Sequence, residues 1–301
     1  MTEIQQYLAE EVAEDLADGI INRREAIRRL GLLGFTGAAA TGLLSAFAAS
    51  EAAAEAPPTH SAGRHGSETN WAPVARESIT FAGPRGPLLA AWAAAAEPRG
   101  GVLVIHENRG LTEHIRTIAG RLAASGYSAL ALDLLSEEGG TGAFPGEAEV
   151  AAALAQIPPE RFVADMKASL TELESRVGGK RLAAVGYCFG GAMVWHLLTS
   201  NEPRLSAAAP YYGPFPEGAS FAGSRAAVLG VYGGLDSRVN ATRPAAKTAL
   251  DAARLKYELV TFDEADHAFF NDTGARFNPH AATEVWRRTL NWFDNAVHRR
   301  G

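Results

Sequence analysis

The single cysteine of this chain, Cys188, lies in the segment Gly186–Gly191, which reads Gly-Tyr-Cys-Phe-Gly-Gly. The apolar run Arg181–Val185 precedes this segment and the helix-prone stretch Ala192–Thr199 follows it, so we predict a strand, a tight turn and a helix. The glycines two residues before and after the cysteine suit a sharp turn, because they lack Cβ atoms that would clash. A sulfur at a helix N-terminus is favoured as thiolate. The pattern predicts a nucleophilic thiol. The alternative, an inert buried cysteine, would not need the flanking glycines.

Three further residues with reactive side chains, Glu107, Asp236 and His267, each follow an apolar run. In an open α/β sheet the reactive groups gather at the carboxyl ends of the strands. The chain order of nucleophile, acid and histidine is that of α/β-hydrolases. We expect Cys188 to attack a carbonyl carbon, His267 to accept and return the proton, and Asp236 to orient the imidazole. The preceding runs are Gly101–Ile105, Ala227–Tyr232 and Tyr257–Phe262.

Each of these assignments has an alternative. Asp236 follows Gly-Gly-Leu and could be a turn residue, and His267 is one of eight histidines. Asp263 and Glu264 are rival acids, whereas the side chain of Asp266, adjacent to the histidine, is expected to point elsewhere. An acyl-transfer site also needs an oxyanion hole. For that role we predict the backbone N–H of Phe189 and a second N–H from Asn108.

Strands and helices alternate along the rest of the chain. This pattern predicts an α/β-hydrolase fold, in which helices cover both faces of a mostly parallel central sheet. We expect one such domain over residues 71–301, opened by an antiparallel pair of strands. Besides the runs named above, the expected strands are Glu77–Phe81, Leu88–Ala94, Tyr127–Leu132, Leu182–Val185 and Ala207–Tyr211, and the expected helices are Glu113–Ser125, Arg161–Arg176, Arg243–Arg254 and Ala281–Val297.

The first 50 residues have the features of an export signal. Arginine pairs occur within Asn22–Leu30, and Leu30–Ala49 carries no charge and is rich in Gly, Ala and Leu. A positive region, a mild apolar region and small residues are typical of a secretory signal, here of the twin-arginine type. We therefore expect a signal region at 1–50, a linker at 51–70, and a periplasmic or secreted protein with no stable membrane association once the signal is removed. An uncleaved membrane anchor is the alternative.

The composition of the chain restricts the classes of binding partner that we expect. The net charge is −6 and the pI is about 5.8, with no basic stretch in the mature part, so nucleic acid is not expected. One cysteine cannot form an internal disulfide and provides no resolving thiol for redox chemistry. No metal site is expected. A monomer is the default, because no exposed apolar helix face is evident in the sequence.

The chain resembles the dienelactone hydrolase family over about residues 76–297. Four features carry the resemblance: the cysteine motif, Gly233–Asp236 (Gly-Gly-Leu-Asp), Asp266–Phe269 (Asp-His-Ala-Phe) and Glu107. The resemblance implies a single-domain α/β-hydrolase with a Cys-His-Asp triad, no cofactor and a small ester or lactone substrate. It also implies that Glu107, in His106–Gly110, activates Cys188 as a partner of the thiol.

The sequence departs from the pattern of the family at one position. The type enzymes have an arginine four residues after the catalytic histidine, which holds the substrate carboxylate, and this chain has Asn271. An amide cannot replace a bidentate cation. Arg109 or Arg276 could compensate, and a lactone or ester other than dienelactone is at least as well supported. Tyr211 and Phe269 are further candidates for contact with substrate.

The main prediction is therefore an ester or lactone hydrolase that forms a thioester acyl-enzyme on Cys188. A thioesterase or amide hydrolase on the same fold is one alternative. A catalytically idle α/β-hydrolase that serves as a binding protein is another.

Overall fold

The computed structural model describes residues 1–53 and 74–297. The chain divides into two compact units. One comprises Met1–Gly66 with Phe144–Pro158, and the other comprises Ser67–Ala143 with Pro159–Gly301. The candidate catalytic residues all belong to the second unit.

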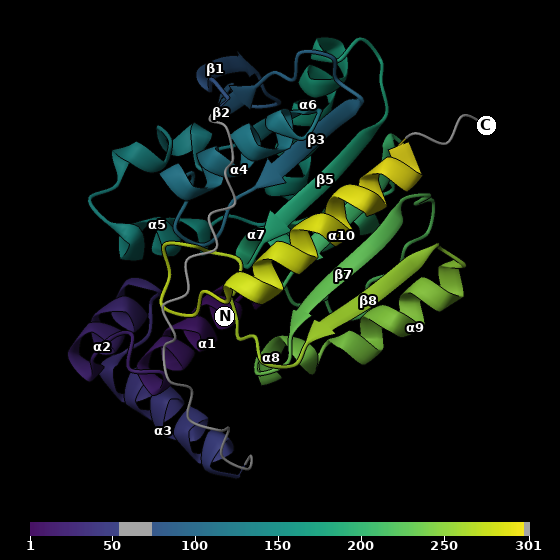
Figure 1. Cartoon of the computed structure of the whole chain (residues 1–301). Helices are drawn as coiled ribbons and strands as arrows, with labels where there is room; N and C mark the ends of the chain where they lie inside the picture. Colours follow the sequence, from purple (N-terminus) through teal and green to yellow (C-terminus); the bar gives the residue numbers. More distant parts are fainter. Residues whose placement is uncertain (54–73, 298–301) are drawn as a thin grey trace. The chain divides into compact units, whose positions relative to one another are not determined.

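The described part of the first unit is helical (Figure 1). Helix α1 begins at a capping box, in which the Thr2 hydroxyl accepts the Gln5 N–H and the Gln5 side chain accepts the Thr2 N–H. Arg28 joins Glu25 of its own helix to Glu149 of α5 through two ion pairs. The described helices include none long and apolar enough to cross a membrane. The predicted linker lies outside the described residues from position 54 on. The helices are α1 (Glu3–Ala17), α2 (Arg23–Leu32), α3 (Gly37–Ala53) and α5 (Glu147–Leu154).

The second unit is built on an eight-stranded sheet with the order β1-β2-β4-β3-β5-β6-β7-β8. β1 pairs with β2 and β2 with β4 in antiparallel fashion, and every other pairing is parallel. Strands β3, β4 and β5 are buried along their whole length, as expected of strands covered on both faces. The strands are β1 (Glu77–Ala82), β2 (Pro87–Ala93), β3 (Gly100–Ile105), β4 (Tyr127–Leu132), β5 (Leu182–Tyr187), β6 (Leu205–Tyr211), β7 (Ala227–Gly233) and β8 (Tyr257–Phe262).

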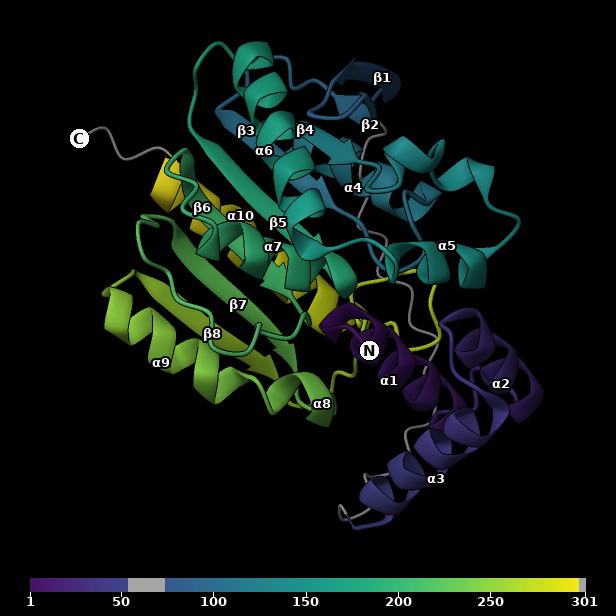
Figure 2. The same cartoon turned by 180° about the vertical axis from the view of Figure 1, so that it is seen from behind.

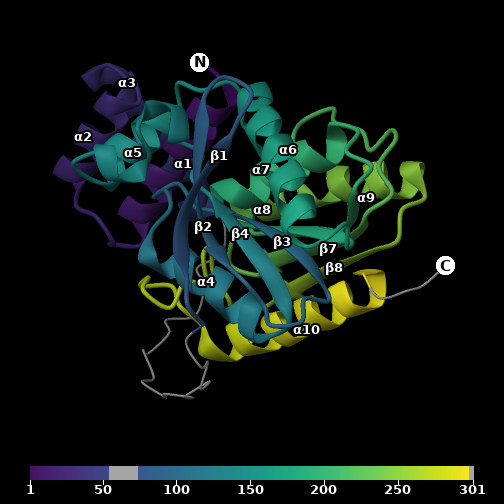
Figure 3. The same ribbon diagram turned by 90° about the horizontal axis from the view of Figure 1, so that it is seen from above.

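Helices cover both faces of this sheet. Figure 3 shows α4 and α10 on one face, and α6, α7 and α9 on the other, where they can also be followed from behind in Figure 2. The predicted mostly parallel α/β-hydrolase architecture is therefore confirmed. The helices of this unit are α4 (Glu113–Ala124), α6 (Pro159–Arg176), α7 (Phe189–Thr199), α8 (Ser237–Asn240), α9 (Arg243–Ala253) and α10 (Pro279–Val297), with the 3₁₀ turns η1 (Ser136–Glu138) and η2 (Thr141–Ala143).

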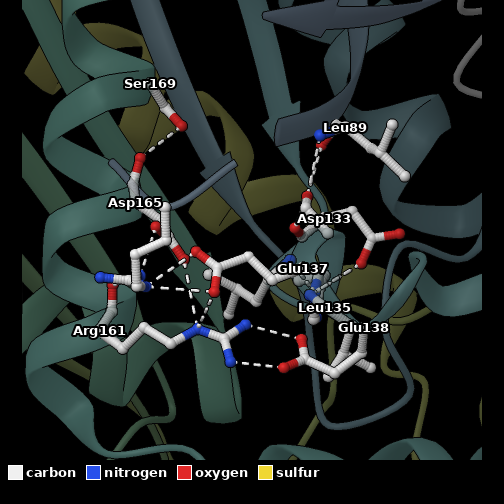
Figure 4. A network of polar contacts seen from close by, with 12 residues as sticks. Leu89, Asp133, Leu135, Glu137, Glu138, Arg161, Asp165 and Ser169 are labelled. Atoms are coloured by element: carbon white, nitrogen blue, oxygen red, sulfur yellow. Dashed lines mark hydrogen bonds and ion pairs between the residues drawn. The ribbon is translucent and has the colours of Figure 1, made fainter. Parts of the chain in front are cut away.

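An ion-pair network anchors the loop after β4 to helix α6 (Figure 4). The Arg161 guanidinium binds the Glu138 carboxylate through both terminal nitrogens and also faces Glu137 and Asp165. Arg85, from the turn between β1 and β2, bonds to Asp165 at 2.8 Å and to Glu137 at 2.9 Å. Three elements distant in sequence are thus joined beside the sheet.

Candidate active site

Cys188 lies on a strained turn between β5 and α7. Its φ and ψ are 55° and −119°, a conformation that residues with a Cβ rarely adopt. A Cβ on Gly186 would lie 2.1 Å from the Gly190 carbonyl oxygen, and one on Gly190 would lie 2.3 Å from the Ile105 oxygen. Only glycine fits at either position, which confirms the predicted reason for the flanking glycines. The turn brings the thiol to the carboxyl end of the sheet.

Asp236 and His267 meet at the same edge of the sheet. The Asp236 Oδ2 and the His267 Nδ1 are 2.7 Å apart, and both side chains are buried. The Asp236 Oδ1 accepts the Val239 N–H at 3.0 Å, which fixes the carboxylate at the start of α8. Burial opposes ionisation of Asp236, but the charge and hydrogen bond of His267 outweigh it, so the pKa of Asp236 lies below its ordinary value. The carboxylate is therefore ionised and holds the imidazole.

The thiol and the imidazole are close to each other. The Cys188 Sγ and a ring nitrogen of His267 lie within 4.8 Å. Two more residues near this point have positive φ, Tyr212 at 36° and Ala268 at 57°, and the Tyr212 ring stands edge-on to His267 at 5.3 Å. Strained backbone of this kind concentrates at functional sites. The rival acid Asp266 accepts the backbone N–H of His267 at 2.6 Å, which agrees with the prediction that it points away from the ring.

Glu107 follows β3 and is buried, with 3% of its surface exposed. Its Oε2 accepts a hydrogen bond from the Asn271 amide at 2.6 Å, and its Oε1 has no hydrogen-bond partner in the described part of the chain. Burial raises the pKa of Glu107, opposed most strongly by the positive charge of His114 and then by that of Arg109. The structure thus places the predicted thiol activator against the residue at which the sequence departs from the family.

His106 fixes the peptide that joins Glu107 to Asn108. Its Nδ1 donates to the Glu107 carbonyl oxygen at 2.6 Å, and its Nε2 accepts the Leu134 N–H at 3.1 Å. Gly110 donates to the same carbonyl at 3.2 Å. Because C=O and N–H point in opposite directions across a trans peptide, these bonds also fix the direction of the Asn108 N–H, the predicted second oxyanion donor. Burial lowers the pKa of His106, so the ring is neutral, as its two bonds require.

The other predicted site residues lie as follows. Phe189 is the first residue of α7, so its N–H has no acceptor within the helix. The Tyr211 hydroxyl bonds to Thr289 on α10 at 2.6 Å, and the Phe269 ring packs against Tyr212 at 5.5 Å. Tyr211 and Phe269 therefore have packing roles that account for their burial, and their contact with substrate stays a prediction.

A second carboxylate–imidazole pair escaped the sequence analysis. The His114 Nδ1 and the Asp272 Oδ1 are 2.7 Å apart, and Arg121 binds the other carboxylate oxygen. The pairing lowers the pKa of Asp272, chiefly through its hydrogen bond to His114. The two partners are 158 positions apart, so no spacing pattern could have linked them. The one available signal was the position of Asp272, directly after Asn271.

Similarity to known proteins decides the family. The model of the dienelactone hydrolase family matches residues 88–297. The chain belongs to the dienelactone hydrolase family. It is a hydrolase with the α/β-hydrolase fold, as the resemblance of its motifs implied.

Curated and solved relatives agree with this family. A candidate carboxymethylenebutenolidase of Escherichia coli O157:H7 is 34% identical over 206 residues, which are 64% of this chain and 75% of that protein. A counterpart in Salmonella typhimurium is 33% identical over 214 residues, covering 66% and 78%. The crystal structure of a candidate dienelactone hydrolase from Klebsiella pneumoniae superimposes with a TM-score of 0.65 at 29% identity, covering 73% of this chain and 98% of that one.

Proposed function

We propose that this enzyme hydrolyses a small carboxylic ester or lactone through a Cys-His-Asp triad formed by Cys188, His267 and Asp236. One observation carries the proposal: a thiol on a strained strand–helix turn lies within 4.8 Å of a ring nitrogen of a histidine whose Nδ1 contacts a buried aspartate. This is the arrangement that nucleophilic acyl transfer requires.

In the first half of the reaction, His267 removes the thiol proton of Cys188 and the sulfur attacks the carbonyl carbon. The C–S bond forms as the carbonyl π bond opens, and the negative charge on oxygen is stabilised by the N–H groups of Phe189 and Asn108. The tetrahedral species then collapses. The C–O bond to the leaving alkoxide breaks, and the imidazolium returns its proton to that oxygen.

In the second half, water hydrolyses the thioester. His267 takes a proton from water and hydroxide adds to the acyl carbon. The C–S bond then breaks to release the acid, and the imidazolium returns its proton to the sulfur, which regenerates the thiol. Asp236 keeps Nδ1 protonated and stabilises the transient imidazolium in both halves. Glu107 controls the charge around the sulfur, because an ionised Glu107 favours the imidazolium form of His267 over its neutral form.

The surroundings of Glu107 support a substrate other than a carboxylate-bearing dienelactone. The Asn271 amide is used by Glu107, and the Asn271 Oδ1 accepts from the N–H and hydroxyl of Thr273 at 3.0 and 2.7 Å. Position 271 offers no cation to a substrate anion, and the nearby Glu107 would repel one when ionised. We therefore propose an uncharged small ester or lactone as the substrate class.

The test is intact-protein mass spectrometry during turnover of a small activated ester. We expect an acyl adduct on Cys188 that disappears after alkylation with iodoacetamide. Cys188→Ala should stay folded and lose esterase activity by at least about 10³-fold, because the nucleophile is absent. Activity near that of the wild type in Cys188→Ala would remove the cysteine from the mechanism, and lack of turnover across esters, lactones and thioesters would favour a binding protein.

We also propose that residues 1–50 direct export through a twin-arginine-type signal, supported by the arginine pairs and the uncharged stretch that follows them. The mature protein is expected to be monomeric and periplasmic or secreted. N-terminal sequencing of exported protein should give a start after about Ala48. A mature chain that begins at Met1 would contradict this proposal.

A further inference from the structure

The turn after β3 carries two groups that the proposed mechanism uses. Residues 107–111, here called the oxyanion turn, contain Glu107 and the backbone N–H of Asn108, the second oxyanion donor. The stabilisation that such a donor gives depends on its direction, because it must point at the oxygen of the transition state rather than at that of the bound ester. A short loop holds a donor in place only if neighbouring side chains fix the loop.

One end of the oxyanion turn is held by His106. Its Nδ1 donates to the Glu107 carbonyl oxygen at 2.6 Å, and its Nε2 accepts the N–H of Leu134, in the loop after β4, at 3.1 Å. Strands β3 and β4 are parallel neighbours in which Ile105 pairs with Leu132, so the residues that follow the two strands meet at the same edge of the sheet. The ring therefore links the start of the turn to the loop after β4.

The other end of the oxyanion turn is held by Thr141. Its hydroxyl accepts the N–H of Leu111 at 2.8 Å and donates to Oδ1 of Asp133 at 3.0 Å. Leu111 is buried, and a buried N–H that loses its acceptor is costly. Gly110 has a φ of 81°, and a Cβ there would lie 2.4 Å from the hydroxyl oxygen of Thr141. The hydroxyl thus packs directly on the backbone of the turn.

Asp133 keeps Thr141 in this position. The aspartate is 4% exposed, and its Oδ2 accepts the backbone N–H of Thr141 at 2.7 Å, so the main chain and the hydroxyl of Thr141 bind one carboxylate. Asp133 is itself fixed, because its N–H donates to the Leu89 carbonyl oxygen on β2 at 2.9 Å and its Oδ1 accepts the Leu135 N–H at 3.1 Å. Through Asp133 and Thr141, the oxyanion turn is held against the sheet.

We propose that Thr141, held by Asp133, is a positioning residue that fixes the direction of the Asn108 N–H for acyl transfer. This role rests on the proposed oxyanion function of that N–H. When the bond from Leu111 to Thr141 is lost, the end of the oxyanion turn is released, although His106 still holds its start. The donor then leaves the line to the transition-state oxygen, and a poorly aligned hydrogen bond is weak. Binding of an uncharged ester depends little on this alignment.

Thr141→Val tests the positioning role, because it keeps the branched shape of the side chain and replaces the hydroxyl by a methyl group. We expect kcat for a small activated ester to fall about 10- to 100-fold with KM within about twofold of the wild type, since the lost interaction acts in the transition state. Thr141→Ser restores a hydroxyl and should recover most of kcat. Thr248→Val, the matched control, removes a hydroxyl that bonds within helix α9 and should change neither constant. An unchanged kcat in Thr141→Val would overturn the proposal.

A trifluoromethyl ketone separates positioning from loss of thiol reactivity. The sulfur of Cys188 adds to the ketone carbon, the carbonyl π bond opens, and the oxygen takes the negative charge that an oxyanion hole binds. Iodoacetamide alkylates the same sulfur by displacement of iodide and forms no oxyanion. In Thr141→Val we expect ketone affinity to fall by the same factor as kcat/KM, and the alkylation rate to stay within about twofold of the wild type. Equal losses in both measurements would indicate a general disturbance of the site and overturn the proposal.

The proposed function and the positioning role can fail separately. Activity that survives complete alkylation of Cys188 would refute the cysteine mechanism and the positioning role with it. Loss of activity on alkylation, together with wild-type affinity of Thr141→Val for the ketone, would refute the positioning role alone. Thermal unfolding reports whether Thr141→Val is folded, and if it is not, Thr141→Ala replaces it in the same measurements.

Discussion

The Asp236–His267 and Asp272–His114 pairs share one contact, a carboxylate oxygen 2.7 Å from Nδ1, but differ in their surroundings. Asp236 is completely buried and its other oxygen accepts a backbone N–H, whereas Asp272 is partly exposed and its other oxygen binds Arg121. The first pair lies beside a thiol. The second joins helix α4 to the loop between β8 and α10.

This difference shows how one pairing can serve two tasks. The Asp236 carboxylate is fully buried and bonds to His267 and a backbone N–H, so its charge acts chiefly on the imidazolium that forms at His267, with Arg238 a smaller influence. At Asp272, Arg121 and solvent share the charge of the carboxylate. The buried pair is suited to stabilising a transient ion during turnover, whereas Asp272 is also held by Arg121 at the partly exposed end of the second pair.

Neutralising each aspartate in turn should give the largest difference in activity between the two pairs. Asp236→Asn should lower kcat/KM by on the order of 10³–10⁴-fold at every pH, because the amide no longer enforces the productive tautomer. Asp272→Asn, the matched control, should lower it by no more than about tenfold. Steady-state kinetics of the two variants on one ester measures the contrast. Equal losses would mean that the pairs are functionally equivalent, contrary to our comparison.

Replacing Asn271, whose amide binds Glu107, should have a smaller effect on activity. Asn271→Asp would place a second carboxyl against the Oε2 of Glu107, so that the two groups share a proton and their first ionisation moves to higher pH. We expect kcat/KM to fall roughly 10- to 100-fold at pH 7 and to recover in part at higher pH. Asn271→Ser, which adds no charge, should show a weaker loss without this recovery. A pH-independent loss in Asn271→Asp would contradict the role of charge at Glu107.

Replacing Asp165, a buried carboxyl outside the active site, should have the smallest effect on catalysis. The variant therefore serves as a reference. Burial raises the pKa of Asp165 to about 6, despite Arg85 and Arg161. The unfolded chain therefore loses this proton near pH 4 and the folded chain near pH 6, so ionisation of Asp165 makes the fold less stable as pH rises through that window. Asp165→Asn should remove this downward slope from the free energy of unfolding, measured by denaturant titration from pH 4 to 7.

The rate–pH profile of Asp165→Asn should match that of the wild type, because the Arg161 network acts on α6 and the loop after β4. A shift of that profile would mean that the network is coupled to Glu107. The effect of Asn271 would then have to be measured against this background.

Much of the fold could be predicted from the sequence, because long apolar runs and amphipathic stretches report burial locally. Every predicted strand was found, and Gly186 and Gly190 proved to be required by close backbone contacts. Helix α5 was missed, since the alanine-rich stretch Glu147–Leu154 follows a glycine-rich loop and has no strong apolar face.

By itself, the sequence determined the order of the elements, the thiol turn and the family, because each of these depends on residues within a few positions of one another. The tertiary structure decided which acid reaches His267, that Asn271 binds Glu107, and that His114 and Asp272 form a pair. These contacts join residues from 31 to 164 positions apart. Their geometry arises only when the strand ends meet at one edge of the sheet, and no local pattern in a single chain encodes it.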